Sequence, residues 1–376
     1  MKITRLAYHY AVWGWQLNPV DLSELNLLVG ASSVGKTQII KAILDLKQLA
    51  QGEALNGVAW DITFVTDGHE YQWLGQTENI GFIEGIHLKN SQYPSPPRPK
   101  ILHETLFRDG ENLVERRNGT ISFKEVDLPV KLSSRESIIC LLHEDEHVAP
   151  ITQGFSQIIF KVDQLTELTA NSWKPHAPLN LAAPTYQTLA GIQQSDLSIL
   201  MKLALLHKNA PDVFTEIKER FIDIFPHVED IKLALLDNDL NPTPYLYLRE
   251  NGMTNWMPSS RISSGMLKSL IFIANLYLCS DGTIILMDEF ENSLGVNCIN
   301  ILNDMMIEER DLQFIITSHH PYIINNIPMT HWKIVTRIGD VVTVKYAADF
   351  ELGDSKHEAF MQLLQLEEFT DGIINE

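Results

Sequence analysis

Residues 30–37 restrict what this chain can fold into more than any other stretch of its 376 residues. Their sequence, Gly-Ala-Ser-Ser-Val-Gly-Lys-Thr, fits the pattern G-x-x-x-x-G-K-[ST], in which backbone N–H groups of a glycine-rich loop surround phosphate oxygens. An apolar run at 25–29 precedes the motif and a helix-like run at 38–44 follows it, so the pattern has the strand and the helix that it needs. The sequence therefore predicts a phosphate-binding P-loop and binding of a nucleoside triphosphate.

Each position of the loop has an expected role. Gly30 and Gly35 allow tight backbone angles and a close approach of the main chain to the ligand. Lys36 is expected to reach the β- and γ-phosphates, and the Thr37 hydroxyl is expected to coordinate Mg²⁺, so ATP and Mg²⁺ are the predicted cofactors. The residues expected to contact the nucleotide are Gly30, Ala31, Ser32, Ser33, Val34, Gly35, Lys36, Thr37 and Gln38.

A second motif supplies the acidic partner that a P-loop requires. The apolar strand at 283–287 ends in Asp288 and Glu289. Mg²⁺ prefers hard oxygen ligands, so Asp288 is expected to hold the metal together with Thr37. Glu289 is the predicted catalytic base, which orients and deprotonates the attacking water.

A third motif follows the strand expected at 313–317, which leads into Ser318, His319 and His320. An imidazole at the end of this strand can lie beside a γ-phosphate and exchange a proton near neutral pH. His319 is the predicted catalytic histidine, alongside Lys36 and Glu289. His320 stays open as an alternative.

Ser263, Ser264 and Gly265 precede a long apolar helix expected at 267–279. Serine and glycine at a helix start form an anion-binding terminus, because the first N–H groups have no partner within the helix. A plain helix N-cap explains the same residues, and it is the better explanation when they are considered alone.

The order of these motifs resembles that of ABC-type ATPases, in the SMC-like and RecF-like branch that includes the OLD family. The resemblance covers about 1–130 and 230–350. It implies that 262–266 corresponds to the ABC signature, which contacts the γ-phosphate held by the P-loop of a second subunit, and that 292–294 is the D-loop. It therefore implies a homodimer, or a higher homo-oligomer, with ATP sandwiched between head-to-tail copies.

Two features of the family pattern do not transfer directly. The signature has Ser-Ser-Gly-Met in place of Ser-Gly-Gly-Gln, so the pattern does not define its contacts. Gln153 and Gln157 are both candidates for the Q-loop glutamine, and spacing does not choose between them.

The expected fold is an α/β P-loop NTPase, the head of an ABC ATPase, with a mixed sheet, an antiparallel β lobe and an inserted helical lobe. The whole chain, 1–376, is expected to be one domain. Its expected parts are a P-loop half with the antiparallel lobe at 1–130, the inserted helical lobe at 131–228, a half with the signature, Asp288, Glu289 and His319 at 229–350, and a C-terminal helix at 351–376.

The expected elements follow from apolar periodicity and turn residues. One strand is expected at 3–17, ended by Asn18 and Pro19. The strands of the antiparallel lobe are expected at 60–66, 71–75, 80–86, 101–107, 113–116 and 120–123. Later elements are expected as strands at 231–236, 245–248, 283–287, 313–317 and 331–336, and as helices at 267–279, 297–310 and 321–326.

Composition narrows the function classes. The formal net charge of −19 opposes adhesion of the whole molecule to nucleic acid. The three cysteines show no C-x-x-C pair, the N-terminus has no signal-peptide core, and no run reaches the roughly 18 apolar residues of a membrane span. We therefore expect a cytoplasmic protein with no membrane partner.

The resemblance also implies a function. No long coiled coil separates the two halves, and the tail is too short for the TOPRIM nuclease domain of OLD proteins. Such stand-alone ATPases resemble components of bacterial anti-phage defence modules. The expected function is therefore an ATP-hydrolysing switch that controls a separately encoded effector protein, such as a nuclease.

Two other function classes compete with this one. The alternative is a RecF-like DNA-repair ATPase that acts directly on DNA; the net charge disfavours it, and acidic residues offset the basic ones of 98–135. The nucleotide-binding subunit of a membrane transporter is a weaker third class, and the β-rich block at 58–125 argues against it.

Overall fold

The computed structural model divides the chain into two compact units, which are described one at a time. The first comprises Met1–Phe160, Gly282–Glu289 and Asp311–Glu376, and the second comprises Lys161–Asp281 and Phe290–Arg310. The structure describes residues 1–81, 98–161, 183–195, 197–236, 243–291, 311–350 and 356–366.

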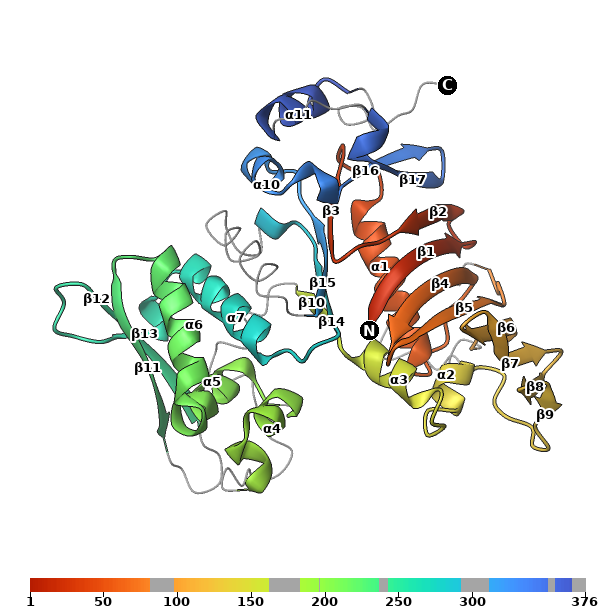
Figure 1. Ribbon diagram of the computed structural model, residues 1–376, viewed down its shortest axis with the longest axis horizontal. Helices are drawn as coiled ribbons and strands as arrows, with labels where there is room; N and C mark the ends of the chain where they lie inside the picture. Colours follow the sequence, from red (N-terminus) through yellow and green to blue (C-terminus); the bar gives the residue numbers. More distant parts are fainter. Residues whose placement is uncertain are drawn as a thin grey trace, which may run out of the picture. The chain divides into compact units, whose positions relative to one another are not determined.

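A mixed sheet forms the first unit, and it has 14 strands among the described residues (Figure 1). Its strands lie in the order β10, β14, β15, β3, β16, β17, β2, β1, β4, β5, β6, β7, β8 and β9. Every side chain of β3, β14 and β15 is buried, as expected for parallel strands that are covered on both faces. The parallel strands are β14 (Thr283–Met287), β15 (Leu312–Thr317), β3 (Leu25–Val29) and β16 (Trp332–Ile338).

The antiparallel lobe belongs to this same sheet. Strand β17 (Val341–Tyr346) is antiparallel to β16 and parallel to β2 (Trp15–Asp21), and β2 pairs antiparallel with β1 (Lys2–Tyr10). The sheet continues from β1 as an antiparallel meander of β4 (Val58–Thr66), β5 (His69–Thr77), β6 (Ile101–Arg108), β7 (Glu111–Arg117), β8 (Thr120–Phe123) and β9 (Val126–Asp127). The α/β class with a mixed sheet, expected from the sequence, is confirmed.

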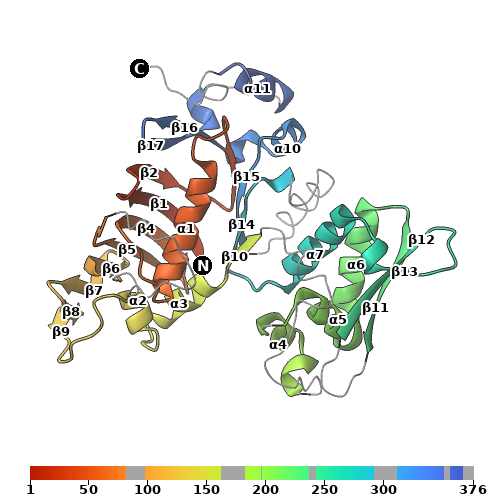
Figure 2. The same cartoon turned by 180° about the vertical axis from the view of Figure 1, so that it is seen from behind.

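Helix α1 (Lys36–Ala50) follows the P-loop and packs on the sheet (Figure 2). Ile39, Ile43 and Leu46 recur at helical spacing and are fully buried in the same core as side chains of β1 and β4. The Tyr8 hydroxyl of β1 donates a hydrogen bond of 2.7 Å to Asp45 of α1. The other helices of this unit are α2 (Ile138–Leu141), α3 (Ala149–Ser156), α10 (Pro321–Asn326) and α11 (Lys356–Leu363).

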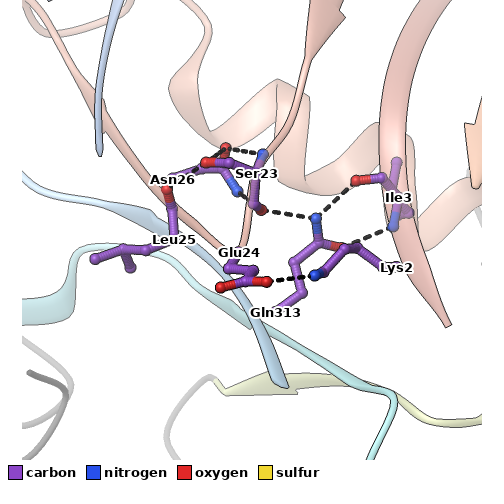
Figure 3. A network of polar contacts seen from close by, with 7 residues as sticks. All are labelled: Lys2, Ile3, Ser23, Glu24, Leu25, Asn26 and Gln313. Carbon is purple, nitrogen blue, oxygen red and sulfur yellow. Dashed lines mark hydrogen bonds and ion pairs between the residues drawn. The ribbon is translucent and has the colours of Figure 1, made fainter. Parts of the chain in front are cut away.

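A buried glutamine connects strands from both parts of this sheet (Figure 3). Gln313 on β15 is 1% exposed; its Nε2 donates to the carbonyl oxygens of Ile3 (2.7 Å) and Ser23 (2.9 Å), and its Oε1 accepts from the Ile3 amide (2.8 Å). Asn26 on β3 donates to the carbonyl oxygens of Ser23 (2.7 Å) and Phe314 (3.1 Å). These bonds hold the amino ends of β1, β3 and β15 together, and the P-loop follows the opposite, carboxyl end of β3.

The second unit is a helical layer on a small antiparallel sheet. Helices α5 and α6 contact this sheet, and α7 packs against both helices. No helix among the described residues combines the length and apolar character needed to span a bilayer. The elements are α4 (Leu189–Gln194), α5 (Ile199–Asn209), α6 (Pro211–Ile224), β11 (Val228–Leu236), β12 (Thr243–Glu250), β13 (Met257–Pro258) and α7 (Ser264–Leu278).

The single strand expected at 3–17 is wrong. The chain turns at 11–14, where Gly14 has φ 70°, and this turn separates β1 from β2. Asn18 and Pro19 lie within β2, at a register shift between β1 and β2. A proline fits at such an irregularity because the ladder does not need its missing N–H there.

Strands β9, β10 (Ile158–Lys161), β13 and β17 are absent from the expected elements, and β10 lies in a region expected to be helical. A four-residue strand is too short to show an alternating pattern. The strand expected at 283–287 and the helix expected at 321–326 coincide with β14 and α10. The helix expected at 297–310, and most of the strand expected at 80–86, lie outside the described residues.

Candidate nucleotide-binding site

The backbone of the P-loop has the conformation that its glycines permit. Gly30 and Gly35 have φ of 146° and 110°, and Ser33 between them has φ 70°. A Cβ atom on Gly30 would lie 2.5 Å from the carbonyl oxygen of Val335, and one on Gly35 would lie 2.8 Å from a methyl group of Val342. The neighbouring strands β16 and β17 therefore leave room for glycine only at both positions.

The positive groups of the loop lie at the start of α1. Lys36 is the first residue of the helix, and its Nζ donates to the carbonyl oxygens of Gly30 and Ala31, both at 2.7 Å. The ammonium group is thus held over the loop, next to the unpaired N–H groups of the helix N-terminus. Ser32 and Ser33 are exposed, whereas Val34, Gly35, Lys36, Thr37 and Gln38 are buried or half-buried.

Asp288 contacts the P-loop helix directly. It follows β14, is half-buried, and its Oδ1 accepts hydrogen bonds from the hydroxyl groups of Thr37 (3.2 Å) and Thr317 (2.6 Å). Strands β14, β15 and β3 are parallel neighbours, so their carboxyl ends lie at one edge of the sheet. The structure therefore brings together the two residues that the sequence predicts as metal ligands.

Glu289 lies beside Asp288 in an unusual backbone conformation. Its side chain is exposed, its φ is 48°, and its amide donates a 2.8 Å hydrogen bond to the Thr317 hydroxyl. Left-handed angles are uncommon for residues other than glycine, and at functional sites they are held by surrounding contacts. The turn directs the chain away from β14 immediately after the acidic pair.

The structure distinguishes the two candidate histidines. The Nδ1 of His320 accepts a 3.2 Å hydrogen bond from the Tyr322 amide and caps α10. His319 is exposed and follows Ser318 at the carboxyl end of β15, the strand between the P-loop strand and β14. His320 therefore has a structural role as a cap, and the catalytic role of His319 stays a prediction.

The donor set at this edge suits Mg²⁺. A hydroxyl and a carboxylate, from Thr37 and Asp288, are hard oxygen ligands, and Mg²⁺ takes few protein ligands when phosphates and waters supply the rest. Within the described ranges, no group of three or more His, Cys, Asp or Glu side chains could hold a metal by itself. Thr37 and Asp288 therefore fit a metal that is shared with a nucleotide.

An aromatic groove lies beside the start of α1. Its volume is about 340 Å³, and its walls include Tyr10, Trp13 and Trp15 on one side and Gln38 and Lys41 on the other. Trp13 is 61% exposed, with its ring centroid 5.4 Å from that of Tyr10. The indole N–H of Trp15 is buried without a hydrogen-bond acceptor among the described residues, close to Gly35.

One carboxyl group in this groove has a perturbed pKa. Burial raises the pKa of Asp45, and the hydrogen bond from Tyr8 acts in the opposite direction. Burial also raises the pKa of Tyr8, so the phenol keeps the proton that it donates to Asp45. The pair is a fixed link between α1 and β1 at the groove wall.

The signature residues lie in the other unit. The Oγ of Ser263 accepts a 3.2 Å hydrogen bond from the Met266 amide and caps α7, whose first residues Ser264 and Gly265 are exposed. This is the N-cap that the sequence alone favours. Gln153 lies in α3, Gln157 is its C-cap, and the expected D-loop at 292–294 lies outside the described residues.

Sequence reasoning missed two parts of this site. Thr317 was part of the motif before His319, but only its neighbourhood to β14 shows that it contacts Asp288 and Glu289. The aromatic residues of the groove could have been noticed in the sequence, because Tyr10, Trp13 and Trp15 lie close together shortly before the P-loop strand.

Comparison with solved structures supports the fold. The structure of an SMC head bound to the C-winged helix domain of ScpA has a TM-score of 0.54 to this chain at 12% identity, covering 92% of this chain and 97% of that one. An SMC head domain from Thermotoga maritima (TM-score 0.43, 12% identity, 92% and 99% covered) and an SMC head with an extended coiled coil, bound to a ScpA domain derived from Pyrococcus furiosus (0.47, 12%, 97% and 98%), also match. Among curated proteins, none matches.

A family match covers most of the chain. Residues 25–325 match the family described as "AAA domain, putative AbiEii toxin, Type IV TA system". The chain belongs to this family. The matched range begins at the P-loop strand and extends past Asp288, Glu289 and His319, so it includes every part of the site at the edge of the sheet. The chain is therefore a P-loop ATPase domain of the AAA type with the fold of an SMC head.

Proposed function

We propose that this chain binds ATP with Mg²⁺ at the carboxyl ends of β3, β14 and β15 and hydrolyses it. The contact between Thr37 and Asp288 carries this proposal, because two motifs 251 residues apart in the sequence meet at 3.2 Å. A chance match to either motif gives no reason for the other to lie beside it. Their meeting is what a shared Mg²⁺ site requires.

The loop and the groove suit different parts of the nucleotide. The loop N–H groups, Lys36 and the start of α1 suit the phosphates, because all are positive ends of dipoles or charges. The groove extends along α1 from Gln38, near the same end of the helix, and its exposed Trp13 and half-buried Tyr10 suit a flat base that stacks on aromatic rings. We infer that the base lies in this groove, with Gln38 and Lys41 near its edge.

The roles in hydrolysis follow from the chemistry of each side chain. Lys36 stabilises negative charge on the phosphates, and bound Mg²⁺ would neutralise further charge there. Glu289 orients the attacking water and accepts its proton, since its carboxylate is exposed at the strand end. His319 contacts the γ-phosphate from the end of β15.

The proposal includes a dimer. Ser263, Ser264 and Gly265 are exposed at the N-terminus of the 15-residue helix α7, so their side chains and N–H groups are open to an anionic ligand. In the head-to-tail arrangement, these residues contact the γ-phosphate bound by the P-loop of a second copy. ATP then joins two subunits of a homodimer or higher homo-oligomer.

The dimer is proposed to control a separately encoded effector, such as a nuclease, in anti-phage defence. The family description refers to a putative toxin and to a type IV toxin–antitoxin system, and such a system has two components. The SMC head in the most similar of the three solved structures described above is itself bound to a second protein, ScpA. Both observations favour a role in which the ATPase acts on a partner protein, and we propose that it does so in the cytoplasm.

Direct action on DNA is the alternative, and the described residues give it little support. In the basic segment at 98–135, Arg116 is buried against Glu104, and Arg117 pairs with Glu115. The remaining Arg and Lys side chains of this segment belong to a chain with a formal net charge of −19, which opposes binding to DNA. DNA affinity that falls steeply with the logarithm of salt concentration would favour the alternative.

The test is Glu289→Gln, with Glu291→Gln as the matched control two residues further along the chain. Glu289→Gln should lower ATP turnover by about 10²- to 10⁴-fold and keep ATP bound, because only the base is lost. In Mg²⁺ and ATP the variant should be dimeric by light scattering, and Glu291→Gln should hydrolyse ATP like the wild type. Turnover at the wild-type rate in Glu289→Gln would show that another group is the base.

A further inference from the structure

One buried hydroxyl contacts both acidic residues of the site. Thr317, the last residue of β15, is 1% exposed. Its Oγ1 donates a 2.6 Å hydrogen bond to Asp288 Oδ1 and accepts a 2.8 Å hydrogen bond from the Glu289 amide. A threonine hydroxyl has one donor and two acceptor positions, so it can make both bonds at once.

The position of this hydroxyl follows from the pairing of the two strands. β14 and β15 are parallel, and Met287 is the partner of Ile316. The next residue of each strand, Asp288 and Thr317, therefore lies at the same level of the sheet. A β-branched residue fits the buried strand end, and threonine is the β-branched residue with a hydroxyl.

The hydrogen bond from Thr317 to Asp288 Oδ1 is shorter than the one from Thr37. Thr317 lies 2.6 Å away and Thr37 lies 3.2 Å away. Thr37 belongs to the P-loop helix and is expected to turn its oxygen toward Mg²⁺, whereas Thr317 has no such second task. Of these two hydroxyl groups, the one on β15 therefore has the closer contact with the carboxylate.

The bond from the Glu289 amide to Thr317 stabilises a backbone conformation that is unfavourable for a glutamate. Glu289 has φ 48°, a left-handed angle that is costly for residues with a Cβ. Its amide is directed at the Thr317 hydroxyl by this turn. Loss of the acceptor removes one of the contacts that hold the turn, and the turn aims the Glu289 side chain.

The neighbouring hydroxyl has a different task. The Oγ of Ser318 accepts a 3.1 Å hydrogen bond from the His320 amide, and its own amide donates to the Leu28 carbonyl. These two bonds of Ser318 hold the segment after β15, and the bonds of Thr317 lead to the acidic pair.

We propose that Thr317 is a positioning residue of the ATPase, which orients the Asp288 carboxylate toward Mg²⁺ and the Glu289 side chain toward the attacking water. It contacts neither reacting atom itself. The inference rests on the proposed ATP hydrolysis. It assigns a function to a residue of β15 outside the P-loop and the acidic pair.

The test compares Thr317→Val, which keeps the shape and removes the hydroxyl, with Thr317→Ser, which keeps the hydroxyl. Thr336→Val is the matched control, because Thr336 is a fully buried threonine of β16 whose hydroxyl bonds a backbone carbonyl. Thr317→Val should lower kcat by about 10- to 100-fold, as loss of an outer partner of a metal ligand does, with KM changed far less. Thr317→Ser should restore most of kcat, and Thr336→Val should keep it.

A second readout does not depend on turnover. In nucleotide-free protein, the Glu289 amide should exchange with deuterium faster in Thr317→Val than in the wild type, Thr317→Ser and Thr336→Val. If the valine variant fails to fold, Thr317→Ala replaces it, and we expect the same lower kcat and the same faster exchange of the Glu289 amide. Wild-type kcat and wild-type exchange in the hydroxyl-free variants would overturn the inference. A wild-type protein that binds no ATP would instead overturn the proposed function.

Discussion

The two glycines of the P-loop are held by neighbouring strands as well as by their own backbone angles. Gly35 has φ 110°, and a Cβ atom there would lie 2.8 Å from Val342 of β17. The loop shape is therefore coupled to a strand near the far end of the chain. A substitution at Gly35 affects both the loop conformation and the packing of β17.

Gly35→Ala should destabilise the protein by about 1–3 kcal/mol, because it combines a strained φ with a collision. Gly110→Ala is the matched control: Gly110 has φ 82°, but nothing lies within 4 Å of the position of its Cβ. Urea unfolding of the two variants separates the collision from the strain. Equal losses in both would show that Val342 does not constrain the loop.

For single residues, the sequence identifies the role of a side chain when that role depends on residues adjacent to it in the chain. Lys36 and Thr37 follow the glycine-rich loop directly, and Glu289 follows the strand and Asp288, so the motifs identify them. The role of Thr317 depends on a strand that lies beside it in space, and no spacing rule encodes that contact. For the same reason, the sequence left His319 and His320 as alternatives, and only the structure shows that His320 caps α10.

At the scale of elements, one buried polar side chain links the parallel part of the sheet to the antiparallel part. Gln313 makes three hydrogen bonds to backbone groups of Ile3, near the amino end of β1, and of Ser23, which precedes β3 (Figure 3). Backbone groups at strand ends have no ladder partner there, so a side chain must satisfy them. Gln313 therefore connects the amino end of β15 to the amino end of β1.

Gln313→Leu should cost about 1–3 kcal/mol for each buried backbone group that it leaves without a partner. Gln72→Leu is the control, since Gln72 is half-buried and its Nε2 donates to the Asp61 side chain on the neighbouring strand β4. Chemical denaturation measures both. Stability within about 0.5 kcal/mol of the wild type in Gln313→Leu would mean that water replaces these bonds without loss.

Elements with strong periodicity or clear turn residues could be predicted, and elements made by tertiary pairing could not. The hairpin of β4 and β5 is marked by Asp67 and Gly68 between alternating runs, and the structure has it there. The turn between β1 and β2 was not predicted, because aromatic residues typical of strands flank it on both sides. Strand β10 is too short to show a pattern, and its pairing with β14 defines it.

At the scale of the whole molecule, the fold class could be predicted because the sequence motifs directly follow the apolar strands that position them. β3, β14 and β15 each end in a motif, and parallel strands bring those ends to one edge. The continuity of the sheet could not be predicted. It depends on β17 pairing with β2, two strands from opposite ends of the chain whose sequences do not indicate each other.

The most direct measurement of the central claim is equilibrium binding of a fluorescent ATP analogue to the wild type and to Lys36→Ala. Lys36 is held over the P-loop by the Gly30 and Ala31 carbonyl oxygens, and its charge is expected at the phosphates. Lys100→Ala, an exposed lysine of the antiparallel lobe, is the control for loss of one positive charge. We expect tight binding by the wild type and Lys100→Ala and no measurable binding by Lys36→Ala. Equal affinity in all three proteins would contradict the claim.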